Sequence, residues 1–185
     1  MKRKKILIIN ICKEQLHYYE FVKPIEEIVA DLKLKYVVKH YKELRKKDIE
    51  KADKIIICGT SLQDNEFAAN VEQFLWLRSF NGAVLGICGG LEIIGLVFGG
   101  KLKKKTEIGF YREKFRKNFL GLSGTVEVYH LHNYFVDFKK LKTFEIFSGG
   151  EIVQAVKHRE KEIYGVLFHP EIRNKEMIIY FAEKI

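Results

Sequence analysis

Residues 86–90 read Gly-Ile-Cys-Gly-Gly and place Cys88 between two apolar runs. The first run, 83–87, is predicted to be a strand, and the second, 91–98, a helix. Glycines permit a tight turn at a reactive side chain, as in a nucleophile elbow with Cys in place of Ser. The N-terminus of the following helix is expected to favour the thiolate and to lower the thiol pKa from about 8.5 to roughly 3.5–7.5. Cys88 is therefore a candidate nucleophile, and a buried structural cysteine is the alternative.

A histidine with a nearby carboxylate follows another predicted strand. The run 163–168 leads directly into His169, Pro170 and Glu171. A thiol nucleophile needs a base, and that base needs a group to orient it. Glu171 is suited to orient the His169 imidazole and to stabilise its charged form. The alternative is a capped histidine at a strand end.

Alternating apolar strands and amphipathic helices are predicted to position these residues. Strands are expected at 5–11, 36–38, 54–58 and 83–87, and helices are expected from Pro24, at 44–52, at 67–77 and at 91–98. This order predicts an α/β fold with a doubly wound, mostly parallel, flavodoxin-like sheet flanked by helices. Ligands bind beyond the carboxyl ends of such strands, where the polar loop 59–65 and Cys88 both fall.

The C-terminal half has a different pattern of apolar and polar residues. Short alternating segments at 125–131, 144–147, 152–156 and 163–168 predict a mixed or antiparallel β region added to the sheet, and 174–184 predicts a closing helix. The basic run 101–105 is expected to be a solvated edge. Six apolar residues of the 67–77 segment are expected to face the core: Phe67, Val71, Phe74, Leu75, Trp76 and Leu77. The chain, residues 1–185, is expected to form a single domain.

Composition excludes several classes of protein. A net charge of +9 without a nucleic-acid-binding motif predicts a solvated basic surface and no nucleic-acid partner, with an acidic or nucleotide-bearing partner as the alternative. The apolar stretch 83–100 contains Glu92 and six glycines, which argues against a membrane helix. The basic start lacks a cleavage site, so it is expected to lead into a first strand, not to be a signal peptide.

The three cysteines are odd in number, and their spacing is not that of metal ligands. No disulfide framework, metal site or cofactor is therefore expected, and a reducing cytoplasm is the expected location.

Taken together, the segments around Cys88 and His169 resemble the class I (triad) glutamine amidotransferase domain. That family has Gly-x-Cys-x-Gly at its elbow and Gly-Val-x-Phe-His-Pro-Glu at the end of its last strand. The second motif reads Gly-Val-Leu-Phe-His-Pro-Glu at 165–171. The resemblance covers nearly the whole chain.

The resemblance implies a glutaminase. Cys88 would attack the side-chain amide of glutamine, His169 would protonate the departing ammonia, and Glu171 would hold His169. Water would then hydrolyse the thioester to glutamate. No cofactor is implied.

Further site residues follow from the same resemblance. The backbone N–H of Gly89, with that of Gly59 or Thr60, would form the oxyanion hole. The segment Leu131-His132-Asn133 corresponds to the one whose backbone grips the amino-acid end of glutamine. His130 and His132 are expected to be structural or supporting, not catalytic.

Some positions depart from the family pattern. Glu92 stands where most amidotransferases have Gln, as in the related γ-glutamyl hydrolases. The sequence Gly-Ile-Cys-Gly-Gly is shared with cobyric acid synthase-like amidotransferases, which lack the Pro-Glu after the histidine. The loop at Gly59 lacks the second glycine and the proline common in the guanosine monophosphate synthetase type.

The function predicted is therefore that of a glutaminase that supplies ammonia to a separate synthetase subunit. The alternative enzyme is a stand-alone γ-glutamyl hydrolase or peptidase, with Glu92 as a substrate contact. The alternative from another class is a catalytically quiet binding or regulatory homologue, and the intact Cys88, His169 and Glu171 argue against it.

Overall fold

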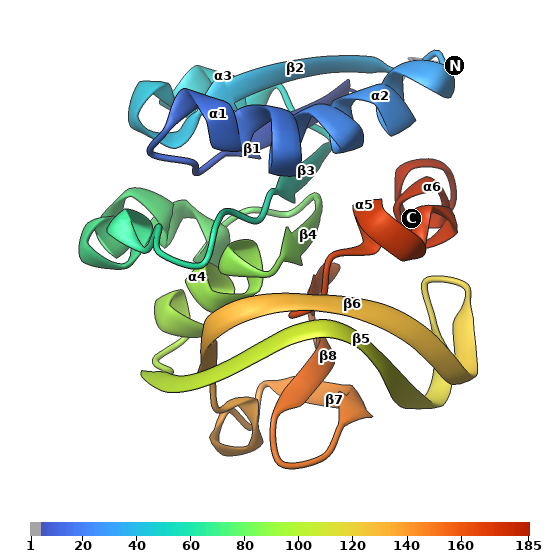
Figure 1. The fold of residues 1–185 in the computed structure, drawn as a ribbon. Helices are drawn as coiled ribbons and strands as arrows, with labels where there is room; N and C mark the ends of the chain where they lie inside the picture. The colour runs from blue at the N-terminus through green and yellow to red at the C-terminus, as the bar shows by residue number, and fades with distance from the viewer. Residues whose placement is uncertain (1–4) are drawn as a thin grey trace.

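A seven-stranded sheet in the order β2-β1-β3-β4-β9-β8-β7 runs through residues 5–185, the part that the computed structural model describes (Figure 1). The first five strands in that order are parallel, and β8 and β7 are antiparallel to their neighbours. The strands of this sheet are β1 (Lys5–Asn10), β2 (Lys35–His40), β3 (Lys54–Ile57), β4 (Ala83–Ile87), β7 (Phe144–Gly149), β8 (Val153–His158) and β9 (Ile163–Val166). The predicted α/β fold with a mostly parallel sheet is confirmed.

Helical segments cover both faces of this sheet. They are α1 (Gln15–His17), η1 (Tyr18–Val22), α2 (Lys23–Asp31), η2 (Tyr41–Glu43), α3 (Lys46–Glu50), η3 (Glu66–Arg78), α4 (Gly89–Val97), η4 (Phe138–Lys140), α5 (Pro170–Arg173) and α6 (Lys175–Lys184). Side chains of η1, α2 and α6 pack on one face of β1 and β3, and those of η3 and α4 pack on the other. Strands covered on both faces are apolar along their whole length, which explains the run Ile6, Leu7, Ile8 and Ile9.

A long hairpin, β5 (Leu102–Phe119) and β6 (Leu122–Val136), forms a separate two-stranded antiparallel sheet. It crosses the molecule in front of β8 in Figure 1. Phe115, Phe119 and Val128 join the core on the face shared with α2 and α6. The sequence predicted only part of β6 and no strand at β5. The basic run 101–105 is mostly exposed, as expected of a solvated edge, and it leads into β5. Two of its lysines form surface ion pairs, Lys103 with Asp137 (2.9 Å) and Lys105 with Glu151 (2.6 Å).

The predicted helix at 67–77 is also different in the structure. Segment η3 is a 3₁₀ helix with a non-helical residue, Asn70, inside it. A 3₁₀ helix repeats every three residues, which keeps Phe74 and Leu77 buried but turns Leu75 outward, where it is 46% exposed.

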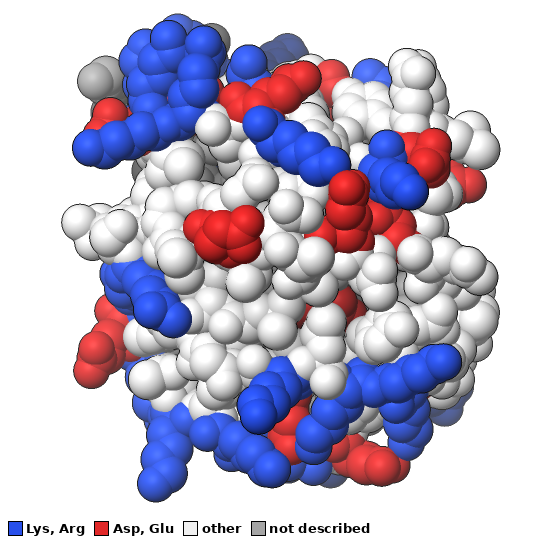
Figure 2. Space-filling view, turned by 90° about the vertical axis from the view of Figure 1, so that its left-hand side faces the viewer, with Lys and Arg blue, Asp and Glu red and all other residues white. Residues whose placement is uncertain are grey.

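Charge is distributed unevenly on the surface. Figure 2 shows lysines and arginines gathered at the upper and lower ends of one face, with a mostly uncharged band between them. Within residues 5–185, no helix has the length and hydropathy needed to cross a membrane.

Candidate active site

Three neighbouring strands end at one place. In the register of the parallel sheet, Ile57 of β3 pairs with Gly86 of β4, and Ile87 of β4 pairs with Val166 of β9. The backbone N–H of Cys88 donates to the Val166 carbonyl at 2.8 Å. The segments after these strands carry Gly59, Cys88 and His169, so the sheet brings the predicted site residues together at its carboxyl edge.

Cys88 occupies a strained backbone conformation between β4 and α4. Its φ is 48° and its ψ is −107°, a region that non-glycine residues rarely adopt and that recurs at functional sites. There is no room for a side chain at the nearby glycines, Gly86 and Gly90. A Cβ at Gly90 would lie 2.3 Å from the Ile57 carbonyl oxygen, and one at Gly86 would lie 2.6 Å from the Gly90 oxygen. The glycines in the sequence 86–90 therefore permit this turn to pack against β3.

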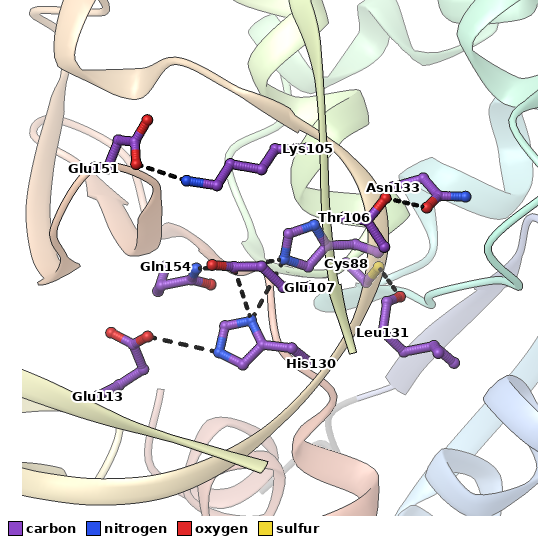
Figure 3. A network of polar contacts seen from close by, with 11 residues as sticks. Cys88, Lys105, Thr106, Glu107, Glu113, His130, Leu131, Asn133, Glu151 and Gln154 are labelled. Atoms are coloured by element: carbon purple, nitrogen blue, oxygen red, sulfur yellow. Dashed lines mark hydrogen bonds and ion pairs between the residues drawn. The ribbon is translucent and has the colours of Figure 1, made fainter. Parts of the chain in front are cut away.

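The Cys88 thiol is almost entirely buried, at 5% exposure, and donates to the Leu131 backbone oxygen at 3.6 Å (Figure 3). Burial raises the pKa of the thiol above its ordinary value, although His169 beside it acts in the opposite direction. The expectation of a lowered thiol pKa is thus wrong for this state. The cost of burying a thiolate outweighs the stabilisation that His169 supplies, and Glu92 and Glu171 add to that cost.

His169 and Glu171 form a buried pair. The Nδ1 atom of His169 lies 2.7 Å from Glu171 Oε1, and both side chains are almost fully buried. Burial alone would lower the pKa of His169, but the Glu171 carboxylate and a Cys88 thiolate outweigh it and raise that pKa well above its ordinary value. The pair therefore stabilises the imidazolium that forms when His169 takes the thiol proton. The Nε2 atom has no other hydrogen-bond partner among the described residues, which leaves it available to the neighbouring thiol. His169 is itself anchored by its backbone N–H, which donates to Tyr129 of β6 at 2.8 Å.

The loop after β3 packs directly on the two candidate catalytic side chains. A Cβ added at Gly59 would lie 2.7 Å from His169 Cε1 and 3.3 Å from Cys88 Cβ. The next residue, Thr60, donates its hydroxyl to Asp64 Oδ2 at 2.7 Å, and that oxygen also accepts from the Lys13 backbone N–H at 2.6 Å. The sequence indicated the loop but not the role of Asp64, which fixes the loop to the segment after β1.

A pocket opens at this loop and the elbow. Most of the residues predicted for the site line it: Thr60, Cys88, Gly89, Glu92 and the segment 131–133. Gly89 is the first residue of α4, so its N–H has no acceptor within the helix. Gly59, His169 and Glu171 lie behind the lining and do not belong to it.

Glu92 lies at the pocket as an uncharged group. It is 5% exposed, and its side chain makes no hydrogen bond to any residue in 5–185. Burial raises the pKa of its carboxyl to about 8, so it is protonated at neutral pH. A protonated carboxyl both donates and accepts, as the amide of Gln does.

The segment 131–133 borders the thiol from β6. Asn133 uses its side chain to hold the site together, because its Nδ2 donates to the Leu62 backbone oxygen at 2.9 Å and its Oδ1 accepts from Thr106 at 2.7 Å. His132 is buried, and this burial lowers its pKa to about 4, which keeps it neutral. The Asn133 side chain is therefore engaged with the protein, whereas His132 Nδ1 has no hydrogen-bond partner among the described residues.

Comparison with known proteins agrees with this geometry. The family model for glutamine amidotransferase class-I matches residues 16–183. Among curated proteins, the chain is 35% identical over 127 residues to a subunit of the glutamine-hydrolyzing GMP synthase of Pyrococcus furiosus, covering 64% of this chain and 65% of the relative. It is 32% identical over 119 residues to the corresponding subunit of Methanobrevibacter smithii, covering 59% of this chain and 60% of the relative. The matches thus span less than two thirds of either relative.

Solved structures show the same fold. A putative GMP synthase subunit of Thermoplasma acidophilum superposes with a TM-score of 0.85 at 18% identity, covering 98% of this chain and 94% of that one. A glutamine amidotransferase of Thermotoga maritima gives a TM-score of 0.72 at 16% identity, with coverages of 100% and 92%. Since the family model covers most of the sequence, the chain belongs to the class I glutamine amidotransferase family.

Proposed function

We propose that this protein is a glutaminase in which Cys88 is the nucleophile, His169 the general acid and base, and Glu171 the residue that orients His169. The single observation that carries the proposal is the position of Cys88 in a strained elbow beside the buried His169–Glu171 pair. A nucleophile, a base and an orienting carboxylate in this arrangement support acyl transfer.

The reaction proceeds in two halves. His169 takes the thiol proton as the sulfur attacks the amide carbon of glutamine, and it gives that proton to the leaving nitrogen, so that ammonia departs and a thioester remains. A water molecule then attacks the thioester while His169 accepts its proton. The returned proton regenerates the thiol, and glutamate leaves.

Preorganised donors must stabilise the oxyanion of each tetrahedral intermediate. We assign the backbone N–H of Gly89 as one donor and that of Gly59 or Thr60 as the other. Removal of one such donor typically costs about 3–4 kcal/mol. The Thr60–Asp64 hydrogen bond supports this assignment, because it fixes the loop that would carry the second donor.

The substrate end of the pocket is formed by α4 and β6. Neutral Glu92 takes the place of the family's usual Gln, and the backbone of 131–133 receives the amino-acid end of glutamine. We further propose that residues 1–185 act as one glutaminase domain whose ammonia is used by a separate synthetase subunit. The curated relatives are named as one subunit of a glutamine-hydrolyzing GMP synthase, so a GMP-forming synthetase is the partner to test first.

One experiment tests both parts. The purified protein is combined with a GMP-forming synthetase subunit from the same source, and GMP formation is measured with glutamine and then with ammonium salt. Wild type should support both reactions, whereas Cys88→Ala should support only the reaction with ammonium. Equal glutamine-dependent activity in wild type and Cys88→Ala would contradict the proposed nucleophile. Hydrolysis of γ-glutamyl peptides in preference to glutamine would favour the alternative enzyme.

A further inference from the structure

Two buried histidines and a glutamate converge beside the pocket in a way that the glutaminase chemistry does not use. His130 and His132 lie two residues apart on β6 and project to the same side, and Glu107 pairs with His132 across the hairpin. Glu107 Oε2 lies 3.0 Å from His132 Nε2 and 3.3 Å from His130 Nδ1. The two ring nitrogens are 3.4 Å apart (Figure 3).

These separations match one face of a tetrahedral metal site. A Zn²⁺ ion with ligands at about 2.0–2.1 Å keeps any two of them about 3.3–3.4 Å apart. The three atoms form a nearly equilateral triangle of that size. Two imidazoles and one carboxylate are also a common protein ligand set for zinc, with a fourth position left to water.

The contacts around the triangle are those of a metal-binding histidine. On the far side of its ring, His130 directs Nε2 at Glu113 Oε1, 3.6 Å away, and Glu113 is held by the Ser148 hydroxyl at 3.3 Å. A histidine that ligates a metal through one nitrogen usually turns its other N–H to a carboxylate. Gln154 Nε2 donates to Glu107 Oε2 at 3.0 Å and orients the third ligand.

The cluster is also shielded from solvent. The ring of His130 is buried, and the side chains of Glu107 and Glu113 beside it are 17–19% exposed.

We propose that Glu107, His130 and His132 form a binding site for one Zn²⁺ or a similar divalent transition-metal ion. The ion joins β5 to β6 at the residues on either side of Leu131, whose carbonyl receives the Cys88 thiol. Its role is to hold the 131–133 segment in register beside the nucleophile. The inference does not depend on the glutaminase proposal, since it concerns binding to the hairpin alone.

The test is metal binding by the full-length protein, prepared without a histidine tag and stripped with a chelator. Zn²⁺ is titrated against a chromophoric competitor, and Co²⁺ is titrated with its visible absorption as the readout. Wild type should bind one equivalent of Zn²⁺, and Co²⁺ should give the intense band of a four-coordinate site. Mg²⁺ should not compete, because it prefers oxygen ligands.

Three variants make the assignment specific. Glu107→Gln and His130→Gln should each weaken Zn²⁺ binding by about 100-fold or more, since even the loss of an outer partner typically costs 10–100-fold. His40→Gln is the matched control, because His40 lies on the outer strand β2, and it should bind as wild type does. Zn²⁺ should raise the thermal midpoint of wild type and His40→Gln but not of His130→Gln.

Three results would each overturn the site. They are binding of less than one equivalent of Zn²⁺ to wild type, unchanged Zn²⁺ affinity in Glu107→Gln and His130→Gln, or an equal loss of Zn²⁺ affinity in His40→Gln. If a variant fails to fold by circular dichroism, the wild-type stoichiometry and Co²⁺ spectrum still decide, because a six-coordinate spectrum contradicts the triangle.

Discussion

Gly59 and His169 lie in direct contact, so that a Cβ at Gly59 would come within 2.7 Å of the imidazole Cε1. The ring cannot retreat easily, because Glu171 holds its Nδ1 and Phe21 packs on it with ring centroids 5.3 Å apart. The backbone at Gly59 therefore fixes the distance between the candidate base and the candidate nucleophile.

Replacement of Gly59 should damage catalysis more than stability. In Gly59→Ala the methyl group displaces His169 or the loop, and a misplacement of about 1 Å can cost about 100-fold in rate. We expect kcat/KM for glutamine to fall by about that factor in a folded protein. Gly150→Ala is the matched control, since nothing lies within 4 Å of a Cβ there. Wild-type kinetics in Gly59→Ala would show that the loop does not set the geometry.

Cys88 should be the cysteine that an electrophilic glutamine analogue modifies. It lines the pocket, whereas Cys58 is fully buried and its thiol pKa is raised well above the ordinary value. Cys12 borders a different pocket, but burial raises its pKa to about 12. Peptide mass spectrometry should find one label, on Cys88, and His169→Ala should slow labelling. A label on Cys12 or Cys58 would contradict the elbow assignment.

Local signals in the sequence were enough to predict the elbow and the strands that carry it. Parallel strands deliver their carboxyl ends to one edge, so the sequence placed Cys88 and the loop after Gly59 together. The run 163–168 before His169 was expected in a mixed or antiparallel region, whereas β9 pairs in parallel with β4. The predicted strand at 83–87 has the bounds of β4. Family membership is confirmed, whereas the catalytic roles of individual residues stay predictions.

What the sequence did not reveal depends on contacts between distant segments. Strand β5 has exposed residues along most of its length, including Ile108 and Phe110, so it lacks an alternating apolar pattern. Glu107 meets His132 only through the register of the hairpin, 25 residues away. The raised thiol pKa likewise follows from burial of Cys88 in the folded chain, which no motif at the elbow encodes.

The isolated protein should hydrolyse glutamine slowly. Its thiol is buried, has a raised pKa and donates to the Leu131 carbonyl, so it rests as a protonated group. We expect a turnover well below the ~10 s⁻¹ typical of enzymes, with stimulation when a synthetase subunit binds. Glutamate release is measured with increasing amounts of that subunit, and Cys88→Ala supplies the background. A full rate in the isolated protein would contradict the prediction.

Glu92 should make the stability of the fold depend on pH. Its carboxyl pKa is about 8 in the folded protein and about 4.5 when exposed, so above pH 4.5 the unfolded chain ionises first and folding loses stability. The loss grows until about pH 8 and corresponds to at most roughly 5 kcal/mol. Glu92→Gln removes this loss of stability, because the Gln side chain does not ionise. Denaturant unfolding at pH 4.5 and pH 8 should therefore show a gain for Glu92→Gln at pH 8 and little difference at pH 4.5.

The same variant separates the two enzyme functions. If neutral Glu92 serves as the family's Gln does, Glu92→Gln should hydrolyse glutamine as well as wild type at pH 7 and better at pH 9, where wild-type Glu92 ionises and opposes the Cys88 thiolate. If an ionised Glu92 instead binds a γ-glutamyl substrate, the variant loses a charge-assisted hydrogen bond worth roughly 1.5–3 kcal/mol. Cleavage of γ-glutamyl peptides would then fall by about tenfold or more. Both substrates are assayed on both proteins at both pH values, and a selective loss on peptides would overturn the amidotransferase proposal.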